Sequence, residues 1–152
     1  MKVGETAPNF ILKDEKGNKF ELYKNLDKKI LLVFYPKDDT PVCSSQLSEY
    51  NDNLKEFSKH GINVVGINAD TIESHNEFCN KLKIKIPLLA DENKIVSKQY
   101  NALNLFGMNK RILILIGTNK KVLWIAPTLS INFIKAGEIL SRISSLNSKE
   151  MT

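Results

Sequence analysis

The sequence predicts an α/β fold in which helices cover both faces of a central mixed β-sheet and a β-hairpin stands at the N-terminus. Two observations favour this fold. Continuous apolar runs, typical of strands buried on both faces, alternate with segments whose apolar residues recur every three or four positions. Later in the chain, two apolar runs flank a tight turn, which predicts an antiparallel pair beside parallel βα units.

The first half of the chain carries alternating strand and helix patterns. The expected elements are strands 9–12, 19–22 and 29–35, helix 41–59, strand 62–68 and helix 71–83. Gly17 supplies the permissive backbone for the turn between the first two strands. Pro41 suits the first turn of a helix, and apolar residues recur at helical spacing from Leu47 to Phe57.

The second half continues the pattern with a hairpin and a final helix. The expected elements are strand 87–90, helix 93–100, strands 111–116 and 121–125, and an amphipathic helix through Phe133, Ile139, Leu140, Ile143 and Leu146. The turn at 117–120 between two apolar runs predicts the hairpin. Because a chain of 152 residues suits one core and shows no linker or repeat, we expect a single domain over 1–152.

Composition excludes several classes of protein. No basic and then apolar segment follows Met1, and no apolar run is long enough to span a bilayer, so we expect a cytoplasmic protein without a membrane partner. The net charge is +5, but the lysines are scattered among acids, which indicates a solvated surface and no nucleic-acid partner. Two cysteines are too few for a disulfide scaffold or a four-cysteine zinc site, and we expect no cofactor or metal.

The most informative segment is 36–43, Pro-Lys-Asp-Asp-Thr-Pro-Val-Cys. It places Cys43 in the first turn of the expected helix, with the Thr40 hydroxyl three residues before it. Backbone N–H groups without intrahelical partners and the helix dipole favour an anion at this position. Since the thiolate is the reactive form of cysteine, the pattern predicts a nucleophile.

This segment resembles the active-site motif of peroxiredoxins, and within them the bacterioferritin-comigratory-protein branch, also called peroxiredoxin Q. The likeness extends to residues 3–10, Ser74-His75 with Phe78, residues 87–91, and Arg111 ahead of an apolar strand. The resemblance implies a thioredoxin-like fold and the reduction of hydrogen peroxide and alkyl hydroperoxides by Cys43. It also implies that Thr40 is the hydroxyl partner, that Pro36 shields the site, and that Arg111 is the cation near the thiolate.

Elementary chemistry agrees with these roles. An ordinary thiol is a few per cent ionised at neutral pH, so complete ionisation gains at most about 30-fold in rate. Efficient peroxide reduction needs donors that stabilise the reacting oxygens, and one such donor is worth about 10²–10³. Thr40, the Cys43 N–H and Arg111 are the candidates. Each side chain also has an ordinary interpretation, since Thr40 suits a helix cap, Arg111 a surface position and Pro36 a strand end. Gln46, one turn on, either holds the loop or is a solvated side chain.

Cys79 has two interpretations. The resemblance implies that the sulfenic acid of Cys43 is resolved by a second thiol, five residues on in many members, where this chain has Ser48. Other members carry that thiol on the next long helix, where Cys79 lies. Alternatively, Cys79 is an inert core thiol on an apolar helix face that it shares with His75. If Cys79 resolves, part of either cysteine helix has to unfold, because the two Cα atoms must come within about 7 Å.

The leading hypothesis is therefore a monomeric thiol peroxidase, resolved through Cys79 and recycled by thioredoxin or a glutaredoxin-like reductant. Two alternatives stay open: a thioredoxin-fold redox sensor or holdase that switches a partner interaction, and a one-cysteine peroxidase resolved by an external thiol. A thiol–disulfide oxidoreductase is disfavoured because Gln46 occupies the place of the second cysteine in a Cys-x-x-Cys motif.

Overall fold

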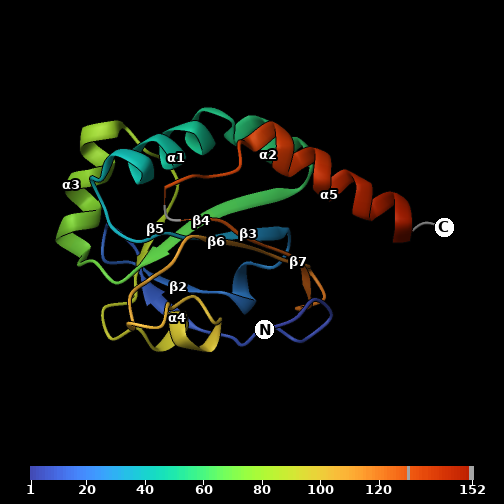
Figure 1. Cartoon of the computed structure of the whole chain (residues 1–152), viewed down its shortest axis with the longest axis horizontal. Coiled ribbons are helices and arrows are strands. Elements are labelled where there is room, and N and C mark those ends of the chain that lie inside the picture. The colour runs from blue at the N-terminus through green and yellow to red at the C-terminus, as the bar shows by residue number, and fades with distance from the viewer. Residues whose placement is uncertain (130, 151–152) are drawn as a thin grey trace.

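The computed structural model describes residues 1–129 and 131–150. Its strands are β1 (Ile11–Lys13), β2 (Lys19–Glu21), β3 (Lys29–Phe34), β4 (Ile62–Asn68), β5 (Leu88–Ala90), β6 (Ile112–Ile116) and β7 (Val122–Pro127). Within the described residues these seven strands form one sheet in the order β2-β1-β5-β4-β3-β6-β7 (Figure 1).

The sheet is mixed, as expected. The strands β3, β4 and β5 run parallel, while β1 is antiparallel to β2 and β5, and β6 is antiparallel to β3 and β7. The register places Phe34 of β3 between Ile67 of β4 and Ile112 of β6. The C-terminal ends of β3 and β4 and the N-terminal end of β6 therefore meet at one edge of the sheet.

Helices cover both faces of this sheet, which confirms the predicted fold class. They are η1 (Tyr23–Asn25, a 3₁₀ turn), α1 (Pro41–Asp52), α2 (Leu54–Lys59), α3 (Ile72–Leu82), α4 (Ile95–Gln99) and α5 (Ala136–Glu150). Side chains of α1, α2, α3 and α5 pack into one core cluster, and α4 packs into a second cluster on the opposite face. Figure 1 shows α1, α2 and α5 on one side of the sheet and α4 on the other. None of the described helices is both long and apolar enough to cross a membrane.

The expected helix 41–59 is two helices, and the reason is local. The Asn53 side-chain amide donates to the Glu49 carbonyl (2.8 Å), the acceptor that the Asn53 N–H would use in a continuous helix. That N–H turns instead to the Tyr50 carbonyl (3.1 Å), and α1 ends there. The C-terminal helix also begins later than expected, at Ala136, so Phe133 precedes it and packs edge-on against Tyr50.

Candidate active site

The sheet brings together residues that are far apart in sequence. Cys43 lies on α1, shortly after β3, and Arg111 directly precedes β6. Because β3 and β6 are antiparallel neighbours, the end of one strand lies beside the start of the other. Arg111 thereby reaches Cys43 across 68 residues of chain, and its Nη2 donates to the Cys43 Sγ at 3.3 Å.

Cys43 is the third residue of α1 and is 1% exposed. Pro41 opens the helix, and the Ser44 N–H closes its first turn on the Thr40 carbonyl (2.8 Å). The Thr40 hydroxyl does not cap the helix; it donates to the Lys37 carbonyl at 3.1 Å. The first-turn N–H groups around Cys43 are therefore not taken by the Thr40 side chain, contrary to the simple cap interpretation.

Arg111 is buried, at 2% exposed, so it is not a surface arginine. Its Nη1 donates to the Gln46 Oε1, and the Gln46 Nε2 donates to the Tyr50 hydroxyl at 3.3 Å. The Tyr50 hydroxyl in turn donates to the Ile134 carbonyl at 2.6 Å. Burial raises the pKa of Tyr50 above its usual range, so this hydroxyl stays protonated. The chain of hydrogen bonds fixes the plane of the guanidinium against the thiol, and Gln46 is part of the site.

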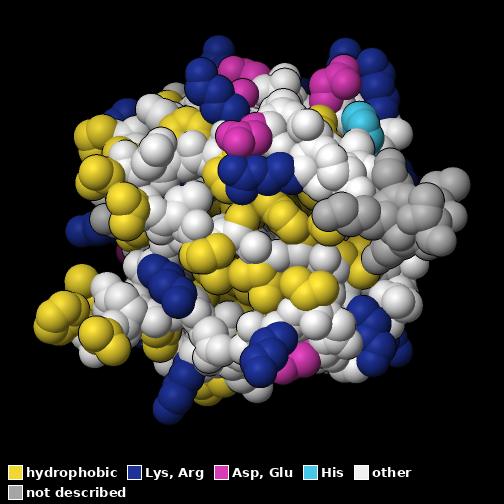
Figure 2. All heavy atoms as spheres, turned by 45° about the vertical axis from the view of Figure 1, so that its right-hand side comes forward, with side chains coloured by type: hydrophobic (Ala, Val, Ile, Leu, Met, Phe, Trp, Pro, Cys, Tyr) yellow, Lys and Arg dark blue, Asp and Glu magenta, His cyan; other side chains and the backbone are white. Residues whose placement is uncertain are grey.

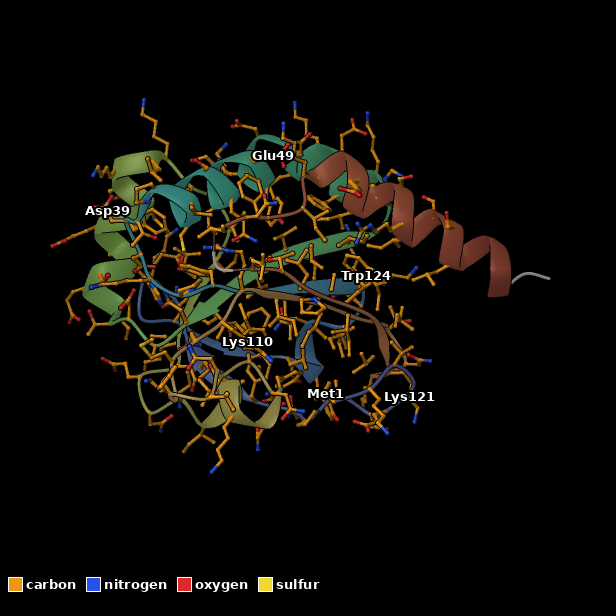
Figure 3. The ribbon with its side chains drawn as sticks, in the orientation of Figure 1. Met1, Asp39, Glu49, Lys110, Lys121 and Trp124 are labelled. Carbon is orange, nitrogen blue, oxygen red and sulfur yellow. The ribbon has the colours of Figure 1, made fainter. Side chains whose placement is uncertain are left out.

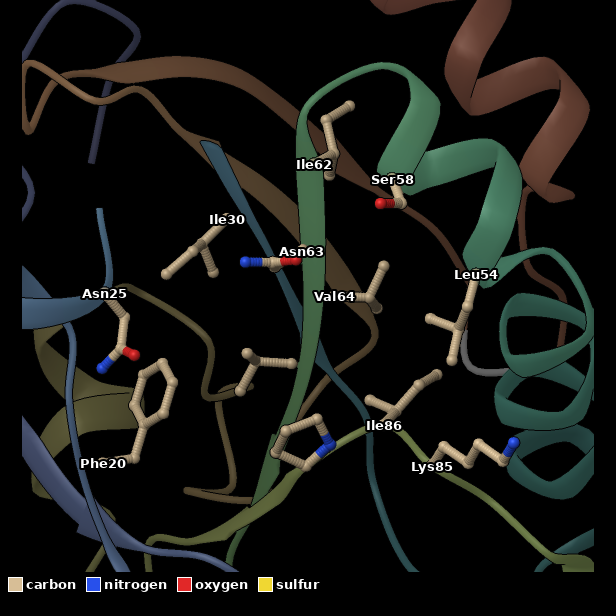
Figure 4. A pocket seen from close by; sticks show the side chains of 12 residues that line it. Phe20, Asn25, Ile30, Leu54, Ser58, Ile62, Asn63, Val64, Lys85 and Ile86 are labelled. Atoms are coloured by element: carbon tan, nitrogen blue, oxygen red, sulfur yellow. The ribbon is translucent and has the colours of Figure 1, made fainter. Parts of the chain in front are cut away.

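Pro36 lies half-buried in the segment between β3 and α1, where it presents no backbone N–H. A pocket of about 440 Å³ lies elsewhere (Figure 4). Its lining residues include Phe20 and Leu54, and neither Cys43 nor Arg111 is among them. The thiol site is thus separate from this cavity.

Cys79 lies on α3 and is 8% exposed. It packs in the same core cluster as Cys43, and both are free thiols. Burial, reinforced by the negative charges of Glu15 and Asp38, raises the pKa of the Cys79 thiol from 9.0 to about 12. One side of the residue borders a hollow of about 400 Å³ next to Glu15. In this conformation Cys79 is a protonated core thiol.

A buried polar cluster around Asp38 was not predicted from the sequence. The Asp38 carboxylate accepts from the Tyr35 hydroxyl (2.6 Å), from the Asn68 amide (3.2 Å), and from the Ser74 hydroxyl (2.8 Å) on α3. The His75 Nδ1 lies 2.6 Å from the same carboxylate. The cluster therefore joins the segment that precedes Cys43 to α3, which carries Cys79.

The hydrogen-bond partners of His75 define its charge. Its ring is fully buried, with the Nε2 at 3.1 Å from the Leu89 carbonyl, which can only accept. Burial opposes the ionisation of Asp38, but the hydrogen bond and charge of His75, with the Tyr35 and Ser74 hydroxyls, hold the pKa of Asp38 below its ordinary value. Because a carboxylate also only accepts, a ring with a proton on each nitrogen, in a His75⁺–Asp38⁻ pair, is the form that satisfies both contacts. Removing one partner of such a buried pair typically costs about 3–5 kcal/mol.

The neighbouring Asp39 adopts a left-handed backbone conformation, with φ 56°. Its carboxylate forms an exposed ion pair with Lys81 of α3 (2.9 Å), where the loop passes that helix (Figure 3). The residues Asp38, Ser74 and His75 fall within segments that carry the family likeness, but no spacing rule connects position 38 to positions 74 and 75. Among the described residues, no group of three or more His, Cys, Asp or Glu side chains is arranged to hold a metal ion.

Comparisons with known proteins agree with this geometry. Residues 3–125 match the model of the AhpC/TSA family. The chain is 41% identical over 105 residues to a chloroplastic peroxiredoxin Q of Sedum lineare, covering 68% of this chain and 56% of that protein. It is 38% identical over 102 residues to a putative peroxiredoxin bcp of Helicobacter pylori, covering 67% of each.

The fold extends the likeness beyond these segments. A crystal structure of peroxidoxin BcpB from Mycobacterium tuberculosis superposes with a TM-score of 0.84 at 28% identity, over 97% of both chains. The chain spans about half the length of the chloroplastic relatives that it matches. The matched family, the named relatives and the shared thioredoxin-like fold lead to one conclusion: this chain belongs to the AhpC/TSA family, in its peroxiredoxin Q (bacterioferritin-comigratory-protein) branch.

Proposed function

We propose that this protein is a thiol-dependent peroxidase that reduces hydrogen peroxide and alkyl hydroperoxides, with Cys43 as the attacking nucleophile. The observation that carries this proposal is the Arg111 guanidinium, 3.3 Å from the Cys43 sulfur at the start of α1. A thiolate at this position faces a fixed cation and the N–H groups of a first helical turn. The names of the relatives, all peroxiredoxins, support the same activity.

The reaction follows from these groups. The Cys43 thiolate attacks one peroxide oxygen, so an S–O bond forms as the O–O bond breaks. The second oxygen leaves with the bonding electrons and takes up a proton, giving water or an alcohol. Arg111 and the Cys43 N–H stabilise the negative charge on the two oxygens, and the Thr40 hydroxyl orients the peroxide. Pro36, which carries no N–H, shields the thiol from water.

The sulfenic acid at Cys43 is then resolved by Cys79. The half-buried Ser48 offers no thiol for this step. The resulting disulfide is reduced by thioredoxin or a glutaredoxin-like dithiol. We further propose that residues 1–152 act as one domain, as a monomer in the cytoplasm. Lysine and arginine side chains lie scattered with acids among them on the face in Figure 2, which supports the absence of a nucleic-acid partner.

Steady-state peroxide consumption with a thioredoxin system tests the activity. Cys43→Ser should abolish turnover, and Thr40→Val should lower kcat/KM for hydrogen peroxide by about 10²–10³, whereas Thr40→Ser, which keeps the hydroxyl, should retain most of it. A parent protein that is oxidised once and then stops would be a redox sensor and would refute the proposal.

Intact mass after one equivalent of peroxide tests the resolving step. Loss of two hydrogens, mapped to Cys43 and Cys79, is the expected result. A persistent added oxygen, together with parental turnover by Cys79→Ser, would instead identify a one-cysteine peroxidase resolved by an external thiol.

A further inference from the structure

The Asp38 cluster connects the segment before Cys43 to α3, the helix that carries Cys79. Asp38 lies five residues before Cys43, and its carboxylate is bound by Ser74 and His75 of α3. His75 lies four residues before Cys79, so the two residues are one turn apart on the same helix. The segment that precedes the nucleophile is therefore attached to α3 one turn away from the second thiol.

The two helices that this cluster joins, α1 and α3, differ in how firmly their first turns are held. The first turn of α1 has no side-chain cap from Thr40 and no acidic residue to complement the helix dipole. Asp39, at the junction between the cluster and α1, is in a left-handed conformation that costs energy for a non-glycine residue.

The helix α3 is better anchored. The Thr71 side chain caps it by accepting from the Ser74 N–H (3.1 Å), and Glu73 complements its dipole. Releasing the loop from α3 would also separate the fully buried His75⁺–Asp38⁻ pair, which is among the costliest local changes in a protein. The easier route to a disulfide is therefore to unwind α1 with the pair intact.

The reach of the freed segment agrees with this route. Bond lengths and the 2.6 Å contact place the Cα atoms of Asp38 and His75 within about 10 Å of each other. One helical turn adds about 6 Å to Cys79. Five residues span up to about 17 Å, and a disulfide itself bridges about 5.5 Å between Cα atoms. Cys43 can thus meet Cys79 while Asp38 stays in place.

We propose that Asp38 and His75 are positioning residues of the resolving step: their ion pair stays closed while the first turn of α1 unwinds, and it holds the freed Cys43 segment beside Cys79. This inference rests on the proposed peroxidase function. In the step itself, the Cys79 sulfur attacks the Cys43 sulfenic sulfur, the S–S bond forms and the S–OH bond breaks. The hydroxide leaves with the thiol proton as water; Cys79 is oxidised and Cys43 reduced.

The size of the effect follows from loop closure. With Asp38 held, five residues from Asp38 to Cys43 search for Cys79. When loss of the pair also releases the other hydrogen bonds of the Asp38 carboxylate, nine residues from the end of β3 at Phe34 do so. The closure probability varies as the −3/2 power of length, which predicts a loss of about 2.4-fold from length alone.

The test compares variants at His75 in single-turnover experiments. The protein receives one equivalent of hydrogen peroxide, is quenched by alkylation at set times, and is weighed intact. His75→Leu should slow disulfide formation about twofold; in a parallel sample that receives excess peroxide, it should also raise the fraction of Cys43 converted to sulfinic acid. His75→Asn, whose amide can still donate to Asp38, should recover much of the rate.

A merely structural role gives the opposite sign, because a weakened fold exposes Cys79 more often. Disulfide formation in His75→Leu as fast as in the parent, or faster, would overturn the proposal. Asp91→Asn is the matched control: Asp91 is also a buried carboxylate, but its side chain accepts from the N–H groups of Val96 and Ser97 at α4. It should destabilise the protein without slowing the disulfide.

A second measurement uses the unaltered protein, in case His75→Leu does not fold. Nitrogen NMR of the His75 ring should show the doubly protonated, buried imidazolium in the reduced form and in the disulfide form. A neutral or solvent-exposed ring in the disulfide form would refute the closed pair. A parent that forms no Cys43–Cys79 disulfide refutes the resolving step first, and that result appears before any variant is made.

Discussion

Alkylation of Cys79 should be strongly suppressed in the folded, reduced protein. The thiol is 8% exposed, and burial with the nearby Glu15 and Asp38 charges raises its pKa from 9.0 to about 12. Three pH units lower the thiolate population about 10³-fold at neutral pH. In free energy this shift amounts to at most about 4 kcal/mol, and solvent at the adjoining hollow reduces that amount. Local opening that costs less than this is the faster route to reaction.

The assay uses Cys43→Ser, in which Cys79 is the remaining cysteine. Iodoacetamide modification is followed by intact mass from pH 7 to 10, with the same protein unfolded in guanidinium chloride as reference. We expect the folded protein to react at least about 10²-fold more slowly than the unfolded one at each pH up to about 9. Modification within tenfold of the unfolded rate, in a protein that still unfolds cooperatively, would refute the claim that burial protects this thiol.

The same shift makes a prediction for stability, with a defined sign. Below pH 9 both folded and unfolded forms keep the Cys79 proton, so the thiol adds no pH dependence. Between pH 9 and about 12 the unfolded chain loses this proton first, so stability falls by up to about 1.4 kcal/mol per pH unit. Guanidinium unfolding of Cys79→Ser as the control should lack this contribution; identical slopes in both proteins would contradict the shifted pKa.

Two further predictions concern the packing behind the site. Gln46→Leu removes the acceptor that orients Arg111, so kcat/KM for hydrogen peroxide should fall about 10- to 100-fold; a parental value would show that the guanidinium is oriented without it. Gly66→Ala places a Cβ 2.7 Å from the Leu88 Cδ2 and 3.2 Å from the Tyr35 ring, and urea unfolding should report a loss of about 1–3 kcal/mol; an unchanged midpoint would mean that the Leu88 side chain moves aside at no cost.

Local sequence determined much of this protein. The continuous apolar runs specified β3, β4 and β6, because strands buried on both faces need no polar alternation. Pro41 and the residues before it placed Cys43 in the first turn of a helix, where backbone N–H groups have no intrahelical partner. These features depend on neighbours within a few residues, so the sequence alone reveals them. The end of α1 at Asn53 is equally local, but the helical periodicity of the apolar residues continues across it and conceals it.

Only the tertiary structure decided which distant side chains meet. The register of β6 against β3 brings Arg111 to Cys43. The same guanidinium donates to Gln46, so Gln46 is a buried partner of Arg111 and not a solvated side chain. The parallel pairing of β3 and β4 likewise brings Asp38 to His75. Such contacts join positions tens of residues apart, and their energy depends on pairing charged groups away from water. Local sequence spacing does not predict which distant groups are buried together. The sequence alone predicts Cys43 as the nucleophile. The groups that contact it and that join its segment to α3 depend on how the sheet is assembled.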